Sequence, residues 1–237
     1  MSARRAHGPV GDQKALPNDP ATRERLLESA TRLFAERGFA RVSVRDICRD
    51  AGANGAAVNY HFGSKLGLYT EVVDRAIATM QNTSDATMQA TGSAEDRLRH
   101  YVRAFMERLV STGSSAWIHR LMQHEMSEPT PAARRILERA IQPRIKYLSE
   151  IVSELLGSSP EDPRVRRSVV SLQAQCLFHA RLFNAADPFR SLLFPRGTPR
   201  APDEFEAAVR HVDQFALAGI EGIKDGRTVG GSDRRSR

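Results

Sequence analysis

The chain has 237 residues, of which 41% are hydrophobic and 6% aromatic, and its formal net charge is +7 at pH 7. This hydrophobic content is enough for a core, the low aromatic share argues against a β-sandwich or barrel, and the positive charge favours a polyanionic partner, either nucleic acid or an anionic membrane surface. Because the sequence has no apolar run of about 18 residues and no signal-like N-terminal segment, we expect a chain that does not cross a membrane.

The N-terminal part predicts a leader and then a helix. Residues 1–18 mix Gly, Pro, Arg and His without periodicity, which is typical of a disordered basic leader. Asp19 and Pro20 are a helix-start signal, and the apolar stripe that follows ends at Gly38, a residue that favours the left-handed helix stop.

Two short helices come next. Ser43 and Asp46 form a variant capping box, which predicts a helix over residues 44–51. Gly52 breaks it, and Asn54 is suited to cap a third helix that runs to about residue 60.

The remainder of the chain also shows helical periodicity, and we find no convincing strand. Ser64 and Ser93 mark two further helix starts, whereas the Pro- and Arg-rich residues 187–202 predict a loop. The further helices are expected near residues 64–80, 93–109, 117–126, 136–156, 165–184 and 205–223. The fold class is therefore all-α, with a helix-turn-helix DNA-binding domain at 19–66, a helical regulatory and dimerisation domain at 67–224, and a disordered basic tail at 225–237.

The three short helices have the arrangement of a helix-turn-helix head, whose last helix would place its N-terminal side chains in the major groove of DNA. Tyr60 and His61, at the end of that helix, can donate to phosphate oxygens. Ser64 exposes helix N-terminal amides, and Lys65 adds a cation that opposes the helix dipole unless a phosphate lies there. The alternative is a partly buried Tyr-His-Phe hinge with a solvated lysine.

The head resembles that of a known family. The matching segments are residues 33–39, 42–47, 51–52 and 60–65, whose sequences and spacing resemble the DNA-binding head of TetR/AcrR transcription regulators over roughly residues 22 to 70. Residues 51–62 are similar to the branch with a CecR-type C-terminal domain, and residues 120–122, 125–126 and 128–130 match that branch more loosely.

The resemblance implies that Ser43, Tyr60, His61 and Lys65 clamp the DNA backbone, which fixes register without reading sequence. This chain departs from the family at two positions, with Gly55 where Lys or Arg is common and Asn59 where Tyr is common. Since Asn can make two hydrogen bonds to an adenine edge, we expect Asn54 and Asn59 to read bases with Arg45, although Asn59 is equally suited to cap the helix end. The full predicted DNA-contact set is Ser43, Arg45, Asn54, Gly55, Ala57, Asn59, Tyr60, His61 and Lys65.

For the C-terminal helices, the resemblance implies a homodimer with a ligand pocket. The helices at 165–184 and 205–223 have broad apolar faces, which fit a four-helix dimer interface or the monomer's own core. Glu125 and its polar neighbours either orient a polar ligand or are solvated. The predicted pocket residues, for which plain core is the alternative, are Tyr101, Phe105, Trp117, Met122, Met126, Cys176 and His179.

The sequence argues against an enzyme, because it has no phosphate-binding loop, dinucleotide fingerprint or nucleophile elbow. Basic residues scatter over all helices, which argues against a membrane-surface protein. Cys48 and Cys176 lie far apart, so we expect a reducing cytoplasm, no metal and no cofactor. The predicted function is ligand-relieved repression by a homodimer bound to a palindromic double-stranded DNA operator, with an unidentified small-molecule effector. The alternative is a DNA-binding dimer whose C-terminal domain senses nothing.

Overall fold

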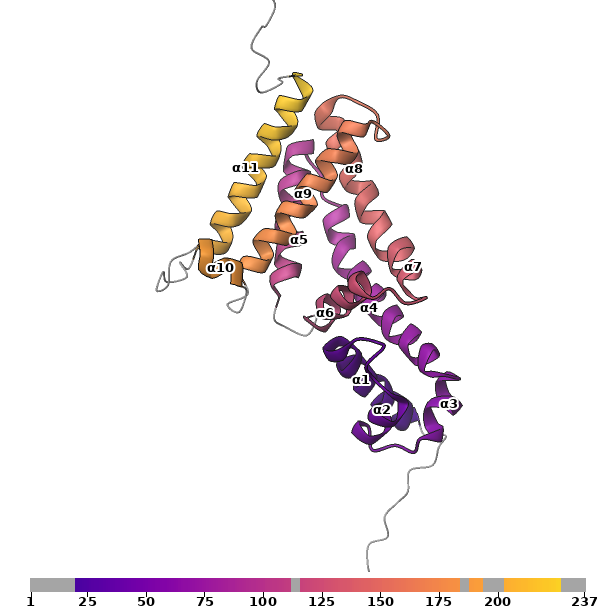
Figure 1. The fold of residues 1–237 in the computed structure, drawn as a ribbon. Helices are drawn as coiled ribbons and strands as arrows, with labels where there is room; N and C mark the ends of the chain where they lie inside the picture. Colours follow the sequence, from indigo (N-terminus) through magenta and orange to yellow (C-terminus); the bar gives the residue numbers. More distant parts are fainter. Residues whose placement is uncertain (1–19, 112–115, 184–187, 194–202, 227–237) are drawn as a thin grey trace, which may run out of the picture. The chain divides into compact units, whose positions relative to one another are not determined.

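The computed structural model describes residues 20–111, 116–183, 188–193 and 203–226, and all the regular elements in these ranges are helices (Figure 1). The all-α prediction is confirmed. The predicted leader, the Asp19 cap and the tail beyond residue 226 lie outside the described residues. The chain divides into two compact units. We call residues 20–74 with 120–130 the head unit, and the other described residues the large unit.

The head unit begins with helices α1 (Pro20–Arg37), α2 (Val44–Asp50) and α3 (Ala56–Phe62), followed by the first part of α4 (Lys65–Met88). The capping box predicted for α2 is present, since the Ser43 hydroxyl accepts the Asp46 N–H and the Asp46 carboxylate accepts the Ser43 N–H. Gly38 and Gly63 adopt positive φ angles of 77° and 71°, which end α1 and α3 at little steric cost. Local signals therefore set these helix ends.

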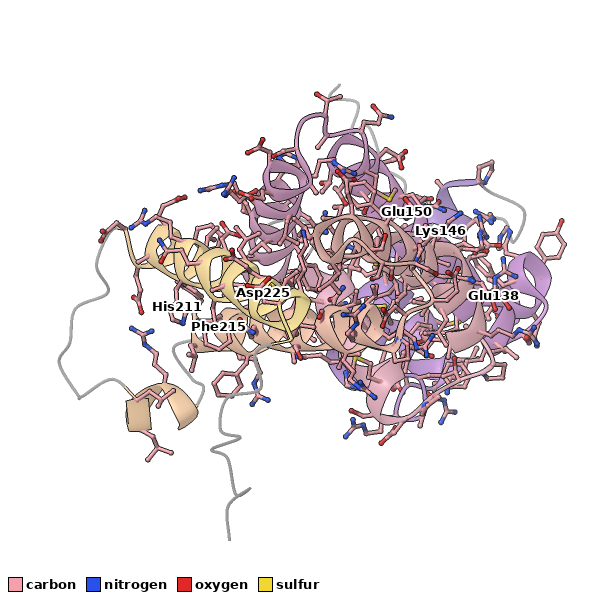
Figure 2. All side chains as sticks on the ribbon, turned by 90° about the horizontal axis from the view of Figure 1, so that it is seen from above. Glu138, Lys146, Glu150, His211, Phe215 and Asp225 are labelled. Carbon is pink, nitrogen blue, oxygen red and sulfur yellow. The ribbon has the colours of Figure 1, made fainter. Side chains whose placement is uncertain are left out.

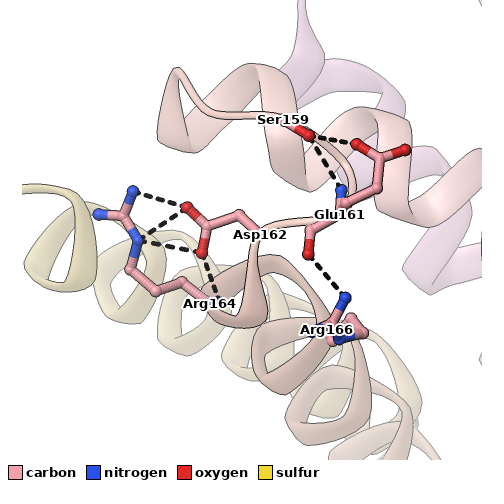
Figure 3. A network of polar contacts seen from close by, with 5 residues as sticks. All are labelled: Ser159, Glu161, Asp162, Arg164 and Arg166. Atoms are coloured by element: carbon pink, nitrogen blue, oxygen red, sulfur yellow. Dashed lines mark hydrogen bonds and ion pairs between the residues drawn. The ribbon is translucent and has the colours of Figure 1, made fainter.

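The core of the large unit lies among α5 (Ala94–Val110), α8 (Gln142–Leu156), α9 (Pro163–Leu182) and α11 (Glu204–Lys224), which pack against one another. Ser93 caps α5 as predicted, by accepting the Asp96 N–H at 3.1 Å. The turn before α9 is fixed by polar contacts, in which the Asp162 carboxylate accepts the Arg164 N–H and also binds the Arg164 guanidinium (Figure 3).

Helix α6 (Ala116–Ser127) contributes residues to both units. The loop predicted at 187–202 is wrong in part, because residues Pro188–Leu193 form the short helix α10. The remainder of that predicted loop, residue 187 and residues 194–202, lies outside the described residues.

The single helix predicted over 136–156 is also wrong in detail. The chain runs through α7 (Ala133–Ile136), a π-helical segment η1 (Leu137–Ile141) and α8. Pro143 is the cause, because it has no N–H to donate and its ring clashes with the carbonyl four residues earlier, at Arg139. The Gln81 amide of α4 donates to that Arg139 carbonyl at 3.0 Å, so its hydrogen bonding is satisfied from another helix.

Candidate nucleic-acid interface

The turn between α2 and α3 is held by backbone and side-chain hydrogen bonds. The Ala53 N–H donates to the Cys48 carbonyl at 2.9 Å, and the Arg25 guanidinium of α1 donates to the Ala51 carbonyl at 3.2 Å. Gly52 supplies a positive φ of 60°. Because residues of both α1 and α2 hydrogen-bond to this turn, it is held in place between α2 and α3, which form a helix-turn-helix.

Helix α3 has one buried and one exposed face. Val58 is fully buried and Ala57 is only 1% exposed, whereas Asn59 is exposed and Tyr60 is 59% exposed. The side chain of Ala57 therefore packs in the head core and is not available to DNA, which corrects its place in the predicted contact set. Asn59 and Tyr60 are available, and the helix end beside them is closed by Gly63, whose N–H donates to the Asn59 carbonyl at 3.0 Å.

The N-terminal end of α3 is organised by Asn54. Its side-chain oxygen accepts the Ala56 N–H at 3.0 Å, but the N-cap residue of α3 is Gly55, so the predicted N-cap position is wrong by one residue. Gly55 is exposed, and a Cβ there would meet no atom within 4 Å. Arg45 is exposed on α2. The hydrogen bond from Ala56 occupies the Asn54 side-chain oxygen. The side-chain N–H groups of Asn54 are therefore the donors that it can offer to a base.

Ser43 is engaged within the chain. Its hydroxyl donates to the Asp46 carboxylate at 2.6 Å, and hydrogen bonds from the Ser43 hydroxyl and backbone lower the pKa of Asp46. A phosphate contact by this hydroxyl would have to replace the bond to Asp46. The backbone amides of the first turn of α2 stay in place in either case.

His61 and Lys65 are less open than the sequence implies. The Nε2 atom of His61 is buried and has no hydrogen-bond partner among the described residues. The Lys65 ammonium lies 4.1 Å from the centre of the Phe39 ring, and burial lowers the pKa of Lys65. Ser64 caps α4 as predicted, by accepting the Gly67 N–H at 3.0 Å. Lys65, the cation of the predicted phosphate clamp, is thus held against an aromatic ring.

Sequence reasoning missed two polar clusters that stiffen the head unit. Asp50 of α2 accepts the Ser29 hydroxyl at 2.5 Å and forms an ion pair with Arg32, both on α1. Glu125 of α6 is 5% exposed, accepts the Tyr69 and Thr130 hydroxyls, and accepts the Thr130 N–H. Glu125 is therefore neither solvated nor a ligand-orienting group, which corrects that expectation. Tyr69 and Glu125 lie 56 residues apart in the sequence, so no local sequence pattern could predict their hydrogen bond.

The predicted pocket residues do not gather in one place. Tyr101 and Cys176 are buried in the core of the large unit with Phe105 packed against it, and His179 on α9 lies 5.6 Å from His211, between ring centres. Trp117 is partly buried in the large unit, whereas Met122 and Met126 belong to the head unit and Met126 is 75% exposed. Of the seven predicted pocket residues, Tyr101, Phe105 and Cys176 lie in or against the same hydrophobic core of the large unit.

The described ranges contain neither a candidate metal site nor a candidate membrane span. No three or more His, Cys, Asp or Glu side chains are grouped so that they could hold a metal ion. None of the described helices combines the length and apolar character needed to cross a membrane.

Comparison with known proteins identifies both parts of the chain. Residues 26–72 match the family described as bacterial regulatory proteins, tetR family, and residues 94–220 match the C-terminal domain of the HTH-type transcriptional dual regulator CecR. The HTH-type transcriptional activator FasR of Mycolicibacterium smegmatis is 25% identical over 210 residues, which are 88% of this chain and 86% of the relative.

Solved structures show the same fold. A TetR-like transcriptional regulator from Rhodococcus sp. RHA1 aligns with a TM-score of 0.59 at 18% identity, over 85% of this chain and 96% of that one. A transcriptional regulator from Saccharomonospora viridis, solved in complex with choline, aligns with a TM-score of 0.57 at 22% identity, over 86% and 97%. The CecR-type match alone covers more than half of the chain. The chain therefore belongs to the TetR family, in the branch with a CecR-type C-terminal domain, and it is a DNA-binding transcription regulator rather than an enzyme.

Proposed function

We propose that this regulator acts as a homodimeric, ligand-relieved repressor on a palindromic operator in the cytoplasm. The observation that carries the proposal is the exposed edge of the helix-turn-helix, where Arg45, Asn59 and Tyr60 are accessible beside a turn that is hydrogen-bonded to α1 and α2. Two such edges related by a twofold axis would enter successive major grooves. In this reading residues 19–66 bind DNA and residues 67–224 dimerise and regulate.

An exposed apolar face on the large unit supports the dimer. Val170, Leu177 and Phe178 on α9 and Phe215 and Ile223 on α11 are exposed large hydrophobic side chains. They lie on the two helices joined by the contact between His179 and His211, and His211 and Phe215 project from the same side of α11 (Figure 2). Exposed apolar side chains on two adjacent helices are typical of a protein interface.

Gly219 and Gly222 lie on the same helix. A Cβ at either glycine would meet no atom within 4 Å in the single chain, so the surface there is open. Small residues at such positions let two helices approach closely, and this supports a helix-packed dimer.

Whether the dimer represses or activates transcription depends on where it binds relative to the promoter. Occupancy of an operator blocks transcription directly, which is why we favour repression, while the relative FasR is named an activator. The choline complex of the Saccharomonospora viridis regulator supports a small-molecule effector as a class.

The test is fluorescence anisotropy of the full-length protein on the intergenic DNA beside its own gene, with random duplex as competitor. Asn59→Ala should reduce the preference for specific DNA over random duplex by at least about fivefold, because one bidentate base contact contributes about 1–3 kcal/mol. Tyr60→Phe removes a phosphate donor and should weaken binding to both duplexes alike. Lys224→Ala on α11, with one cation removed in the large unit, is the control and should leave DNA affinity unchanged. Failure of the wild type to bind any duplex at low salt would contradict the proposal.

A thermal-shift screen of small molecules distinguishes the proposed ligand sensor from the alternative, a DNA-binding dimer with no sensing role. A sensor is stabilised in proportion to the logarithm of ligand concentration over Kd. A protein without a pocket shows no compound-specific shift.

A further inference from the structure

Two histidines are in ring contact on the exposed apolar face of the large unit. His179 of α9 and His211 of α11 have ring centres 5.6 Å apart, with 52° between the ring planes. His179 is partly buried and His211 is exposed. The His211 ring centre also lies 6.1 Å from that of Phe215, one turn further along α11, and both side chains project from the same side of the helix (Figure 2). A pair of titratable rings therefore lies among exposed apolar side chains.

The surface around the pair has the spacing of a helix-packing seam. Each helix has exposed residues separated by four and then three positions, which keeps them on the side of a helix that packs along another helix. They are Val170, Ala174 and Leu177 on α9 and His211, Phe215 and Ala218 on α11. The histidine pair thus belongs to a surface that is shaped to pack against further helices.

The two helices also carry opposite net charges. Helix α9 has four arginines and no acidic residue, whereas α11 has four acidic residues and two basic ones. A twofold packing that places α9 of one copy against α11 of the other brings these opposite charges together. The partner that this charge distribution favours is therefore a second copy of this chain.

We propose that the pair of His179 and His211 makes the association of two copies of this chain dependent on pH, so that the dimer holds together while both imidazoles are neutral and dissociates when they are protonated. The inference rests on the proposed homodimer and names its regulation. Protonation places two positive charges in ring contact, and an apolar interface removes the water that would screen them. Histidine is the side chain that ordinarily changes its charge near neutral pH.

The direction of the pH effect follows from burial of the pair. Burial, and after it the charge of His211, lower the pKa of His179 in the single chain. Enclosure in an interface acts in the same direction, so the dimer binds protons less tightly than the separated chains do. The cost to the dimer is absent above the pKa of the imidazoles in the separated chains, about 6.5 for an ordinary histidine, and grows as the pH falls below it.

The other titratable or charged groups within four residues of the pair do not produce this dependence. Burial raises the pKa of Cys176 to about 12, so the thiol stays neutral. Burial raises the pKa of Asp213 to about 6, and the proton that it binds at lower pH removes its charge, which favours burial instead of opposing it. Arg181 and Arg210 keep their charge throughout.

Charged groups on the helices packed against α9 and α11 are engaged with other partners. Those of α5, α8 and α10 include the ion pairs Arg97–Glu154, Arg103–Glu206 and Arg190–Glu204. Arg99 of α5 pairs with Glu95 and Asp96. Lys146 and Glu150 of α8 lie well apart from His211 (Figure 2).

The experiment measures the dimer Kd of the full-length protein by sedimentation velocity over a series of protein concentrations, at about pH 8 and about pH 5.5 and at constant ionic strength. Far-UV circular dichroism of each sample reports whether the chain is folded. The double variant His179→Gln with His211→Gln removes both titrating rings, and His211→Lys holds a positive charge at either pH. His100→Gln and His100→Lys are the matched controls, because His100 is exposed on α5.

We expect the wild-type Kd to be at least about tenfold higher at the lower pH, the effect of one ordinary imidazole that titrates in the separated chains and stays neutral in the dimer. The double glutamine variant should change by less than about twofold between the two pH values. His211→Lys should already have a raised Kd at the higher pH. The His100 variants and Asp213→Asn should respond as the wild type does.

The proposal is overturned if the folded wild type has the same Kd at both pH values, or if the double glutamine variant keeps the wild-type response. Loss of the response in Asp213→Asn would assign it to that carboxyl and would equally overturn the proposal. His211→Lys gives a test that needs no acid, since a Kd equal to that of His100→Lys at the higher pH also contradicts the proposal.

DNA binding is measured on the same preparations at the higher pH. A dimer that binds DNA but does not respond to pH refutes only the role of the histidine pair. A chain that is monomeric at the higher pH at every concentration refutes the proposed homodimer.

Discussion

The head unit and the large unit differ in how their carboxyl groups are satisfied. In the head, Glu125 is buried and accepts three hydrogen bonds, and Asp50 is held by Ser29 and Arg32. In the large unit, one buried carboxylate oxygen of Asp213 has no hydrogen-bond partner among the described residues. A buried group that is satisfied by the chain stabilises one rigid geometry, whereas an unsatisfied one leaves free energy to be gained on binding. These satisfied carboxylates suit the head to present a fixed surface to DNA.

The largest expected effect comes from breaking the satisfied cluster of the head. Glu125→Ala leaves the Tyr69 hydroxyl, the Thr130 hydroxyl and the Thr130 N–H without their acceptor in a buried site, so the free energy of unfolding should fall by about 3 kcal/mol. Urea unfolding at fixed protein concentration measures it. Glu128→Ala, an exposed position on the same stretch, should change stability by less than about 0.5 kcal/mol. Equal losses in the two variants would contradict a special role for Glu125.

The next effect tests the unsatisfied carboxyl of the large unit. Burial raises the pKa of Asp213 to about 6, against smaller opposing effects of Arg99 and Arg103. The folded state therefore binds the proton more tightly than the unfolded state, whose Asp pKa is near 3.9. The cost of holding the ionised group is absent below about pH 4 and complete above about pH 6.

Asp213→Asn should accordingly raise the free energy of unfolding by about 2 kcal/mol at pH 8 and by almost nothing at pH 4. Denaturant titrations across that pH range provide the check. Glu221→Gln, exposed on the same helix, is the control and should show no such trend. If Asp213→Asn raised the free energy of unfolding equally at pH 4 and pH 8, ionisation of the partly buried Asp213 carboxyl would carry no free-energy cost, and the prediction would be wrong.

A third, smaller effect compares equivalent caps in the two units. Ser43→Ala and Ser93→Ala each remove a hydroxyl that accepts the backbone N–H of the third residue after it, and each should cost about 1 kcal/mol of stability. Only Ser43→Ala should also weaken DNA binding in anisotropy measurements, since Ser93 caps α5 of the large unit. Loss of DNA affinity in Ser93→Ala at a temperature where the protein is fully folded would contradict this separation.

The smallest stability effect is expected at Lys65. Its contact with the Phe39 ring contributes about 0.5–1 kcal/mol, while the burial that lowers the pKa of Lys65 acts against it. Lys65→Gln should therefore change the free energy of unfolding by less than about 1 kcal/mol. It should still weaken DNA binding and reduce the slope of log K against log salt by about one. An unchanged slope would remove Lys65 from the phosphate clamp, and Lys224→Gln provides the comparison.

Much of the helical framework was predictable because its signals are local. Ser43 and Ser93 each lie three residues before an acidic partner, and Gly38 and Gly63 lie where a positive φ closes a helix. Capping and helical periodicity act within about four residues, so they can be read along the chain. The start of α3 was predicted to within one residue for the same reason, since Asn54 bonds the Ala56 N–H from the position before the N-cap Gly55.

The sequence by itself thus determined the helices, their caps and the helix-turn-helix segment, since each depends on near neighbours. The tertiary structure decided that Ala57 faces the core, that Pro143 produces a π-helical segment relieved by Gln81, and that Glu125 belongs to the head. These outcomes depend on which distant residues pack against one another, and burial and charge compensation follow from that packing rather than from the pattern of any one segment.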